Sequence, residues 1–247
     1  MKHLITTAFL LLTILTAQAQ VDTINTANLK LNMAAWRDTK ASYAVFFEDS
    51  LGKRLSSADI WDRTLRRTTV AGRPQYQFVW DWFHRDSLMA HVTATGQWPS
   101  LAPLTHDAVY TRRGKRNFVF NNTVVTIPDS AWRTAKDSSF RVITQQAAFE
   151  FPMDLEIFAL LPFRKVGQQF AIAFYEPGSP TSAYYALRVT DRRKLPLPGQ
   201  ATLDCWLLRI DYRPDSYATF WISDKPREVI KMSEYFRGRY RYKVKLY

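Results

Sequence analysis

The side chains in this sequence that could bind a metal or cofactor do not form a recognised motif. Asp81, His84 and Asp86 lie close together in the chain, and His and Asp are common metal ligands. A zinc site needs three or four convergent ligands, however, and these residues fall where a strand gives way to a turn. The glycine patterns of Walker and Rossmann nucleotide sites are also missing. We therefore predict neither a metal site nor a cofactor.

Nucleophilic and acid–base catalysis have no well-supported candidates either. Ser179 lies in a Pro-Gly turn and not in a Gly-x-Ser-x-Gly motif. Asp154 and Glu156 are two residues apart on a predicted helix, so their carboxylates do not face one another. Other acidic neighbours, such as Glu48 and Asp49, could form a carboxylate pair of the kind that glycoside hydrolysis uses. The sequence does not give the distance between their carboxylates, so this reaction is unsupported. We expect a non-enzymatic protein.

Large aromatic side chains remain as the most distinctive feature. The segment 75–83 places four of them at every second position, and each can bury on the order of 150–250 Å². Two interpretations stay open: the rings fill a core, or some of them line a concave groove that takes an apolar ligand. On the second interpretation, the predicted ligand-binding residues are Trp80, Trp82, Trp206, Trp221, Tyr240 and Tyr242.

Basic side chains are concentrated in the last predicted strand, where they alternate with apolar residues. Strict period two is typical of a half-buried strand, and we expect the apolar side to face the core and the cationic side to face water. The exposed cations would contact an anionic surface, or would protect an edge strand from pairing with other chains. The predicted contact residues are Arg237, Arg239, Arg241, Lys243 and Lys245.

The elements that must position these side chains are mostly strands. Alternating segments separated by Gly, Pro, Asn and Asp turns recur along the chain, which predicts ten to twelve short strands. We expect a mainly β fold: one strongly curved antiparallel sheet, closed or half closed as a barrel, with one or two short helices. A β-sandwich is the alternative. One apolar segment, 153–161, is bounded by Pro152 and Pro162 and is predicted to be a helix on the concave side.

The N-terminus predicts export. Residues 1–19 have a short basic start, a leucine-rich run and the small-x-small sequence Ala17-Gln18-Ala19, which together are typical of a cleaved signal peptide. Residues 20–247 contain no linker or repeat, and we expect them to form a single domain in the periplasm or outside the cell. The one cysteine, Cys205, has no disulfide partner and is predicted to be buried.

The formal net charge of +12 would suggest nucleic acid in a cytosolic protein. Export leaves other polyanions as partners, among them anionic lipid headgroups, lipopolysaccharide and surface glycans. A basic surface that only contacts solvent is the alternative. We therefore predict no nucleic-acid partner and a monomer.

Several motifs in the second half resemble a known family. They are Leu160-Leu161-Pro162-Phe163, Ala218-Thr219-Phe220-Trp221-Ile222-Ser223, Pro226-Arg227-Glu228-Val229-Ile230-Lys231-Met232 and Gly238-Arg239-Tyr240-Arg241-Tyr242. The chain resembles, over 153–246, the bacterial envelope family catalogued as domain of unknown function 3108. The resemblance implies an exported protein whose curved sheet is similar to the half-barrel of LolA-like lipoprotein carriers, and it brings no catalytic residues.

Two functions therefore stand as expectations. The first is an exported, non-enzymatic envelope protein that binds an apolar or amphipathic, lipid-like ligand in the concave face of a β half-barrel. The second is a structural or protein-interaction module of the envelope that has a filled core and no ligand. A continuous apolar groove favours the first function, whereas a fully packed interior favours the second.

Overall fold

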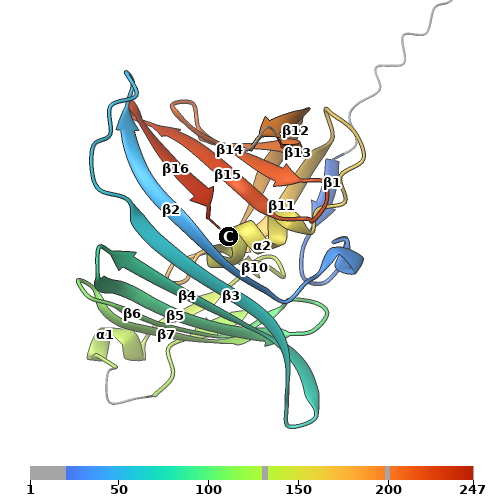
Figure 1. Ribbon diagram of the computed structural model, residues 1–247. Helices are drawn as coiled ribbons and strands as arrows, with labels where there is room; N and C mark the ends of the chain where they lie inside the picture. The colour runs from blue at the N-terminus through green and yellow to red at the C-terminus, as the bar shows by residue number, and fades with distance from the viewer. Residues whose placement is uncertain (1–20, 130–132, 198–200, 247) are drawn as a thin grey trace, which may run out of the picture.

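The computed structural model describes residues 21–129, 133–197 and 201–246, and these residues form one large, strongly curved sheet (Figure 1). The strands are β1 (Val21–Ile24), β2 (Thr39–Asp49), β3 (Asp59–Val70), β4 (Arg73–His84), β5 (Ser87–Gln97), β6 (Pro103–Tyr110), β7 (Gly114–Asn121), β8 (Val124–Thr126), β9 (Arg141–Ile143), β10 (Phe149–Glu150), β11 (Gln169–Tyr175), β12 (Ala183–Pro196), β13 (Thr202–Arg213), β14 (Ser216–Ser223), β15 (Val229–Phe236) and β16 (Arg239–Lys245).

The mainly β fold and the single curved sheet are confirmed, and the β-sandwich alternative is wrong. Within the described residues the sheet has sixteen strands in the order β1-β11-β12-β13-β14-β15-β16-β2-β3-β4-β5-β6-β7-β8-β9, and β10 pairs with β11 as a branch. Neighbours pair antiparallel, apart from β1 and β10, which run parallel to β11. Consecutive strands are joined by short turns over most of this order, as the alternating sequence pattern indicates.

The sheet closes through side chains and not through strand pairing. Among the described strands, β1 and β9 end the sheet order and are not paired with each other. A second core cluster joins Phe118 and Phe120 of β7 to Ala173 and Tyr175 of β11, and the rings of Phe120 and Tyr175 are 5.8 Å apart. The alternate residues of β11, such as Phe174, belong to the main core. Because side chains alternate along a strand, the β7–β9 end overlaps the opposite face of β11.

Short helical segments complete the described part of the chain: η1 (Met33–Ala35), α1 (Ala135–Ser138), η2 (Phe151–Met153) and α2 (Asp154–Ala159). The helix expected at 153–161 is present, although η2 and α2 cover 151–159 and end two residues earlier than predicted; Figure 1 shows α2 lying inside the curve of the sheet. No helix in the described ranges is long and apolar enough to cross a membrane.

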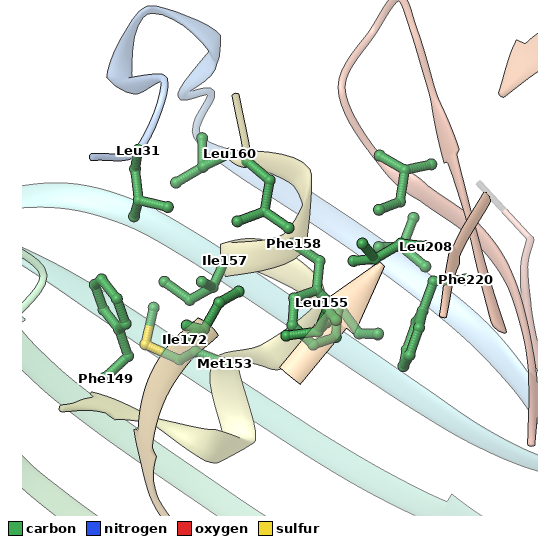
Figure 2. Packing of buried hydrophobic residues seen from close by; sticks show 14 of the residues in the cluster. Leu31, Phe149, Met153, Leu155, Ile157, Phe158, Leu160, Ile172, Leu208 and Phe220 are labelled. Atoms are coloured by element: carbon green, nitrogen blue, oxygen red, sulfur yellow. The ribbon is translucent and has the colours of Figure 1, made fainter. Parts of the chain in front are cut away.

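The helix α2 fills much of the interior. Phe158 of α2 is fully buried, and its ring lies 4.9 Å from that of Phe220 on β14 and 6.0 Å from that of Phe174 on β11. Figure 2 shows Leu155, Ile157 and Phe158 in contact with the buried side chains around them. The concave side of the sheet around α2 is therefore a packed core.

The short strands β9 and β10 were not predicted. Segment 142–149 is ambiguous in sequence, and the structure forms β9 and β10 at its ends. Strands of two or three residues have too little alternation to be recognised, and they exist because a neighbouring strand offers hydrogen bonds. The predicted signal peptide, 1–19, lies outside the described residues.

Candidate functional site

A groove lies at one mouth of the curved sheet, where β2, β15 and β16 meet. Its volume is about 460 Å³. Register explains how it forms, because Arg241 lies opposite both Phe47 on β2 and Glu234 on β15, and Arg239 lies opposite Phe236. Residues two apart on a strand share a face, so these side chains all point to the same side of the sheet. The lining residues are Phe47, Glu234, Phe236, Arg237, Arg239 and Arg241.

The groove has an excess of positive charge. It holds three arginines and one glutamate, and the Nε atom of Arg241 donates a 2.7 Å hydrogen bond to Glu234. Among the residues that the structure describes, Arg237 and Arg239 form no ion pair, and the Arg237 guanidinium lies 5.0 Å from the centre of the Phe236 ring. Arginine binds carboxylate and phosphate groups through two parallel hydrogen bonds. The groove therefore offers an anion site beside two apolar rings.

The turn that carries Arg237 is strained. Arg237 has φ +50° and Gly238 has φ +78°, which makes a two-residue hairpin turn between β15 and β16. The first position of such a turn is normally taken by Asn, Asp or Gly, because other side chains rarely adopt positive φ. The turn therefore places a long cation at the groove at a cost in backbone energy.

A buried lysine follows the groove inward along β16. Only 5% of the surface of Lys243 is exposed. Its Nζ atom is 3.8 Å from Oδ2 of Asp154 on α2 and 4.6 Å from the centre of the Trp61 ring. Burial lowers the pKa of Lys243 to about 8, although the nearby Asp154 carboxylate opposes that shift. The amine is thus held inside the molecule close to α2.

A second buried cation, Arg63 of β3, is tied to the same helix. Its Nε donates to Glu156 Oε1 at 2.9 Å, and its Nη2 donates to Glu156 Oε2 at 2.5 Å and to the carbonyl of Pro152 at 2.6 Å. The Arg63 side chain also lies 3.8 Å from Asp154. The interior network therefore contains two cations, Arg63 and Lys243, and two carboxylates, Asp154 and Glu156.

The expected orientation of the last strand is wrong. The alternation is real, but the basic residues lie on the inner face and Tyr240 and Tyr242 lie on the outer one. Lys243 is buried beside Asp154, and Lys245 donates a 2.6 Å hydrogen bond to Glu228. The predicted exposed stripe is therefore replaced by a row that runs from the groove into the core. The reversal is stable because α2 and β15 supply carboxylates to the inner cations.

The two predicted tyrosines join an aromatic row on the outer face. The ring of Tyr240 lies 5.2 Å from that of Tyr235 and 6.2 Å from that of Tyr242, which in turn lies 5.3 Å from Phe46. Trp221 is on this face too, and the Lys231 amine lies 5.1 Å from its ring centre. Cross-strand aromatic pairs of this kind stabilise a sheet. These three predicted ligand-binding residues therefore do not face the groove.

The three other predicted aromatic residues lie on the inner face but contribute to different clusters. Trp80 and Trp82 lie on β4 and contact Trp61 on the neighbouring β3, whose ring centre is 4.8 Å from that of Trp80. Trp206 on β13 stacks on Phe163 at 5.6 Å, and its Nε1 donates to Asp224 at 2.9 Å. Of all the predicted site residues, the groove brings together only the arginines of 237–241.

The histidines form carboxylate pairs that sequence reasoning missed. His84 Nδ1 lies 2.6 Å from Asp59, and His91 Nδ1 lies 2.6 Å from Asp81. His106 is buried with its Nδ1 against Oε1 of Glu150 on β10. None of these pairings is visible in the sequence, because the partners come from different strands. In the described ranges, no group of three or more His, Cys, Asp or Glu side chains could hold a metal ion.

The buried cysteine is confirmed. Cys205 is fully buried, and burial raises the pKa of its thiol to about 11. A thiol in this environment stays protonated at neutral pH, so it behaves as a small apolar side chain.

Similarity to known proteins is limited to solved structures. No family model matches the chain, and no curated protein matches it. Membership of domain of unknown function 3108 therefore stays a prediction. Among solved structures, the chain is similar to a β-barrel-like protein of domain of unknown function 1849 from Brucella abortus, with 9% sequence identity and a TM-score of 0.46. The match covers 84% of this chain and 94% of that one.

Proposed function

We propose that this protein is a non-enzymatic binding protein that holds an amphipathic ligand with an anionic head in the mouth groove. The observation that carries the proposal is the lining of the groove, where the rings of Phe47 and Phe236 lie beside three arginines. Its volume of about 460 Å³ falls within the range of about 300–1,000 Å³ for small-molecule sites. The packed interior around α2 supports a ligand at the mouth and not deep inside the sheet.

The anionic head would contact Arg237 and Arg239. These two guanidinium groups have no carboxylate partner among the described residues, whereas Arg241 is paired with Glu234. A carboxylate or phosphate can therefore bind them without first breaking an ion pair. The apolar part of the ligand would lie on the phenylalanine rings. A fatty acid has both features and is a suitable probe.

The experiment measures oleate binding by isothermal titration calorimetry in buffer without vesicles. Arg239→Gln should weaken binding about tenfold or more, because a hydrogen bond to a charged group is worth about 1.5–3 kcal/mol. Arg237→Asn should also weaken it, and because Asn tolerates positive φ this variant should fold at least as stably as the natural chain. Loss of binding in Arg237→Asn therefore cannot be attributed to unfolding.

The matched control is Arg73→Gln, which removes an exposed arginine at the start of β4. Arg73 pairs with Val70 at the end of β3, far along that strand from the β2–β3 connection. It changes the net charge equally and should leave oleate binding unchanged. If all three variants bind oleate as the natural chain does, the groove is not the site.

The alternative function, a structural module of the envelope, is favoured by one specific observation. The concave side below the groove is filled by α2, and Leu155, Ile157 and Phe158 are buried there. Failure of the natural chain to bind any amphipathic anion would support this alternative over a binding protein.

We also propose export and a relationship to the envelope family of unknown function, on the basis of the first nineteen residues and the motifs of the second half. The mature protein would then begin at Gln20. N-terminal sequencing of the protein from its native cell would test this, and a retained Met1 would contradict it.

A further inference from the structure

Two connections at the groove mouth carry exposed apolar side chains side by side. Asp49 at the end of β2 lies opposite Arg239 at the start of β16, so the β2–β3 connection adjoins the β15–β16 turn. In Figure 1 both connections lie at the top left of the sheet. Leu51 is 92% exposed, which is the largest value for a large apolar residue in the described chain, and Leu55 and Phe236 are 44% and 43% exposed. We call Leu51, Lys53, Leu55, Phe236 and Arg237 the mouth tip.

The exposure of Leu51 is built into the loop. The Asp49 carboxylate accepts hydrogen bonds from the backbone N–H groups of Leu51 and Lys53, both at 2.9 Å. The Gly52 N–H donates to the Asp49 carbonyl at 3.1 Å, and Gly52 has φ +79°, which suits glycine. The Leu55 N–H donates to the Phe47 carbonyl at 2.9 Å. An ordered turn therefore holds an apolar side chain in water.

Cations surround these apolar side chains. Lys53 and Arg54 lie between Gly52 and Leu55 in the loop, and Arg237 and Arg239 flank Gly238 in the adjacent turn. The nearby acids are already engaged: Glu48 lies 3.9 Å from Arg54, and the Asp49 carboxylate binds the loop backbone. The Arg54 guanidinium also lies 3.6 Å above the Phe46 ring. Four cations against two acids leave the mouth with a formal excess of two positive charges.

We propose that the mouth tip docks on the surface of an anionic lipid bilayer. Leu51 and Phe236 would enter the apolar boundary of the bilayer, while Lys53 and Arg237 would contact its negatively charged headgroups. Nucleic acid offers the charge but no apolar phase for a protruding leucine, whereas an anionic bilayer offers both. The positive charge of the mouth tip and its exposed apolar side chains are therefore both complementary to an anionic bilayer.

Docking in this orientation would turn the groove toward the bilayer. Phe236 and Arg237 belong to the mouth tip and also line the groove. An amphipathic molecule could then pass between bilayer and groove with little exposure of its apolar part to water. The docking inference rests on the exposed loop and not on what the groove binds, so either proposal can fail while the other stands.

The experiment is cosedimentation with phosphatidylcholine vesicles, prepared with and without phosphatidylglycerol. The natural chain should pellet more with phosphatidylglycerol, and high salt should reduce the difference because exposed charges are screened. Leu51→Asp should lower partitioning about tenfold or more, since it removes the apolar side chain that would enter the bilayer and adds repulsion from the anionic headgroups. Lys53→Gln should lower it about fivefold. Val166→Asp, which changes an exposed apolar residue in the connection between α2 and β11 and outside the mouth tip, should have a smaller effect than Leu51→Asp.

Three results would overturn the proposal. The natural chain pellets equally with and without phosphatidylglycerol at low salt. Leu51→Asp and Val166→Asp reduce pelleting alike, which would reflect net charge only. Sedimentation velocity shows a dimer that Leu51→Asp dissociates, which would make a second copy the partner. Oleate binding in buffer without vesicles should be unchanged in Leu51→Asp, because Leu51 does not line the groove, and this result separates loss of docking from loss of the ligand site.

Discussion

The buried ion pair between β3 and α2 permits a sharp test of what holds the helix inside the sheet. Arg63 and Glu156 are joined by two hydrogen bonds, of 2.9 Å and 2.5 Å, and their side chains are 3% and 12% exposed. Glu156→Gln keeps the shape of the side chain and removes its charge. Arg63 would then remain in the core without its principal counterion.

The size of the effect follows from the geometry. Two unit charges 2.9 Å apart attract by about 6 kcal/mol at an effective dielectric constant of about 20. The glutamine would still accept one neutral hydrogen bond, and Asp154 would remain 3.8 Å from Arg63. Breaking one side of a buried pair typically costs about 3–5 kcal/mol, and we expect the lower end, about 3 kcal/mol, here.

The assay is urea unfolding at neutral pH, monitored by tryptophan emission. Glu48→Gln is the matched control, because it breaks the exposed pair with Arg54 and should cost about 0–1 kcal/mol. A double variant with methionine at positions 63 and 156 should recover most of the loss, since an apolar pair of similar volume replaces both charges. If Glu156→Gln costs less than about 1 kcal/mol, the interior charge of Arg63 is compensated elsewhere and the reasoning fails.

Three further predictions concern the interior. Leu160→Ala should cost about 2–5 kcal/mol by urea unfolding, because Leu160 is buried where α2 ends, and a loss of a few tenths would show that the helix does not pack on the core. Tyr76→Phe should be neutral or stabilising in the same assay, since the buried Tyr76 hydroxyl has no hydrogen-bond partner among the described residues; a loss above about 1 kcal/mol would reveal a bound water or ligand. The pKa of Lys243 is about 8 when folded and 10.5 in its ordinary state, so the unfolded chain binds more protons between these values and stability rises with pH there. Lys243→Met should remove that rise, and equal pH profiles for the two proteins would contradict the assignment.

The sequence alone determined the fold class and which residues of a strand lie on the same face. Period-two alternation and frequent turn residues identify strands such as β4 and β16, because a side chain on a pleated strand must point opposite to its neighbour. Two prolines bound the apolar run at 153–161, and they predict a helix there because proline is tolerated in a first helical turn and interrupts a helix interior. Short strands such as β9 and β10 could not be predicted, since neighbouring strands create them.

Only the tertiary structure decided which face of β16 is the inner one. The alternation of Arg241 and Lys243 with Tyr240 and Tyr242 is compatible with either orientation, and propensity favours tyrosines inside. The inner side is chosen by partners that are distant in the sequence: Asp154 on α2 lies beside Lys243, and Glu234 pairs with Arg241. A buried cation is tolerated only where a carboxylate forms an ion pair with it. Whether the two groups come close enough depends on how the sheet curves around the helix.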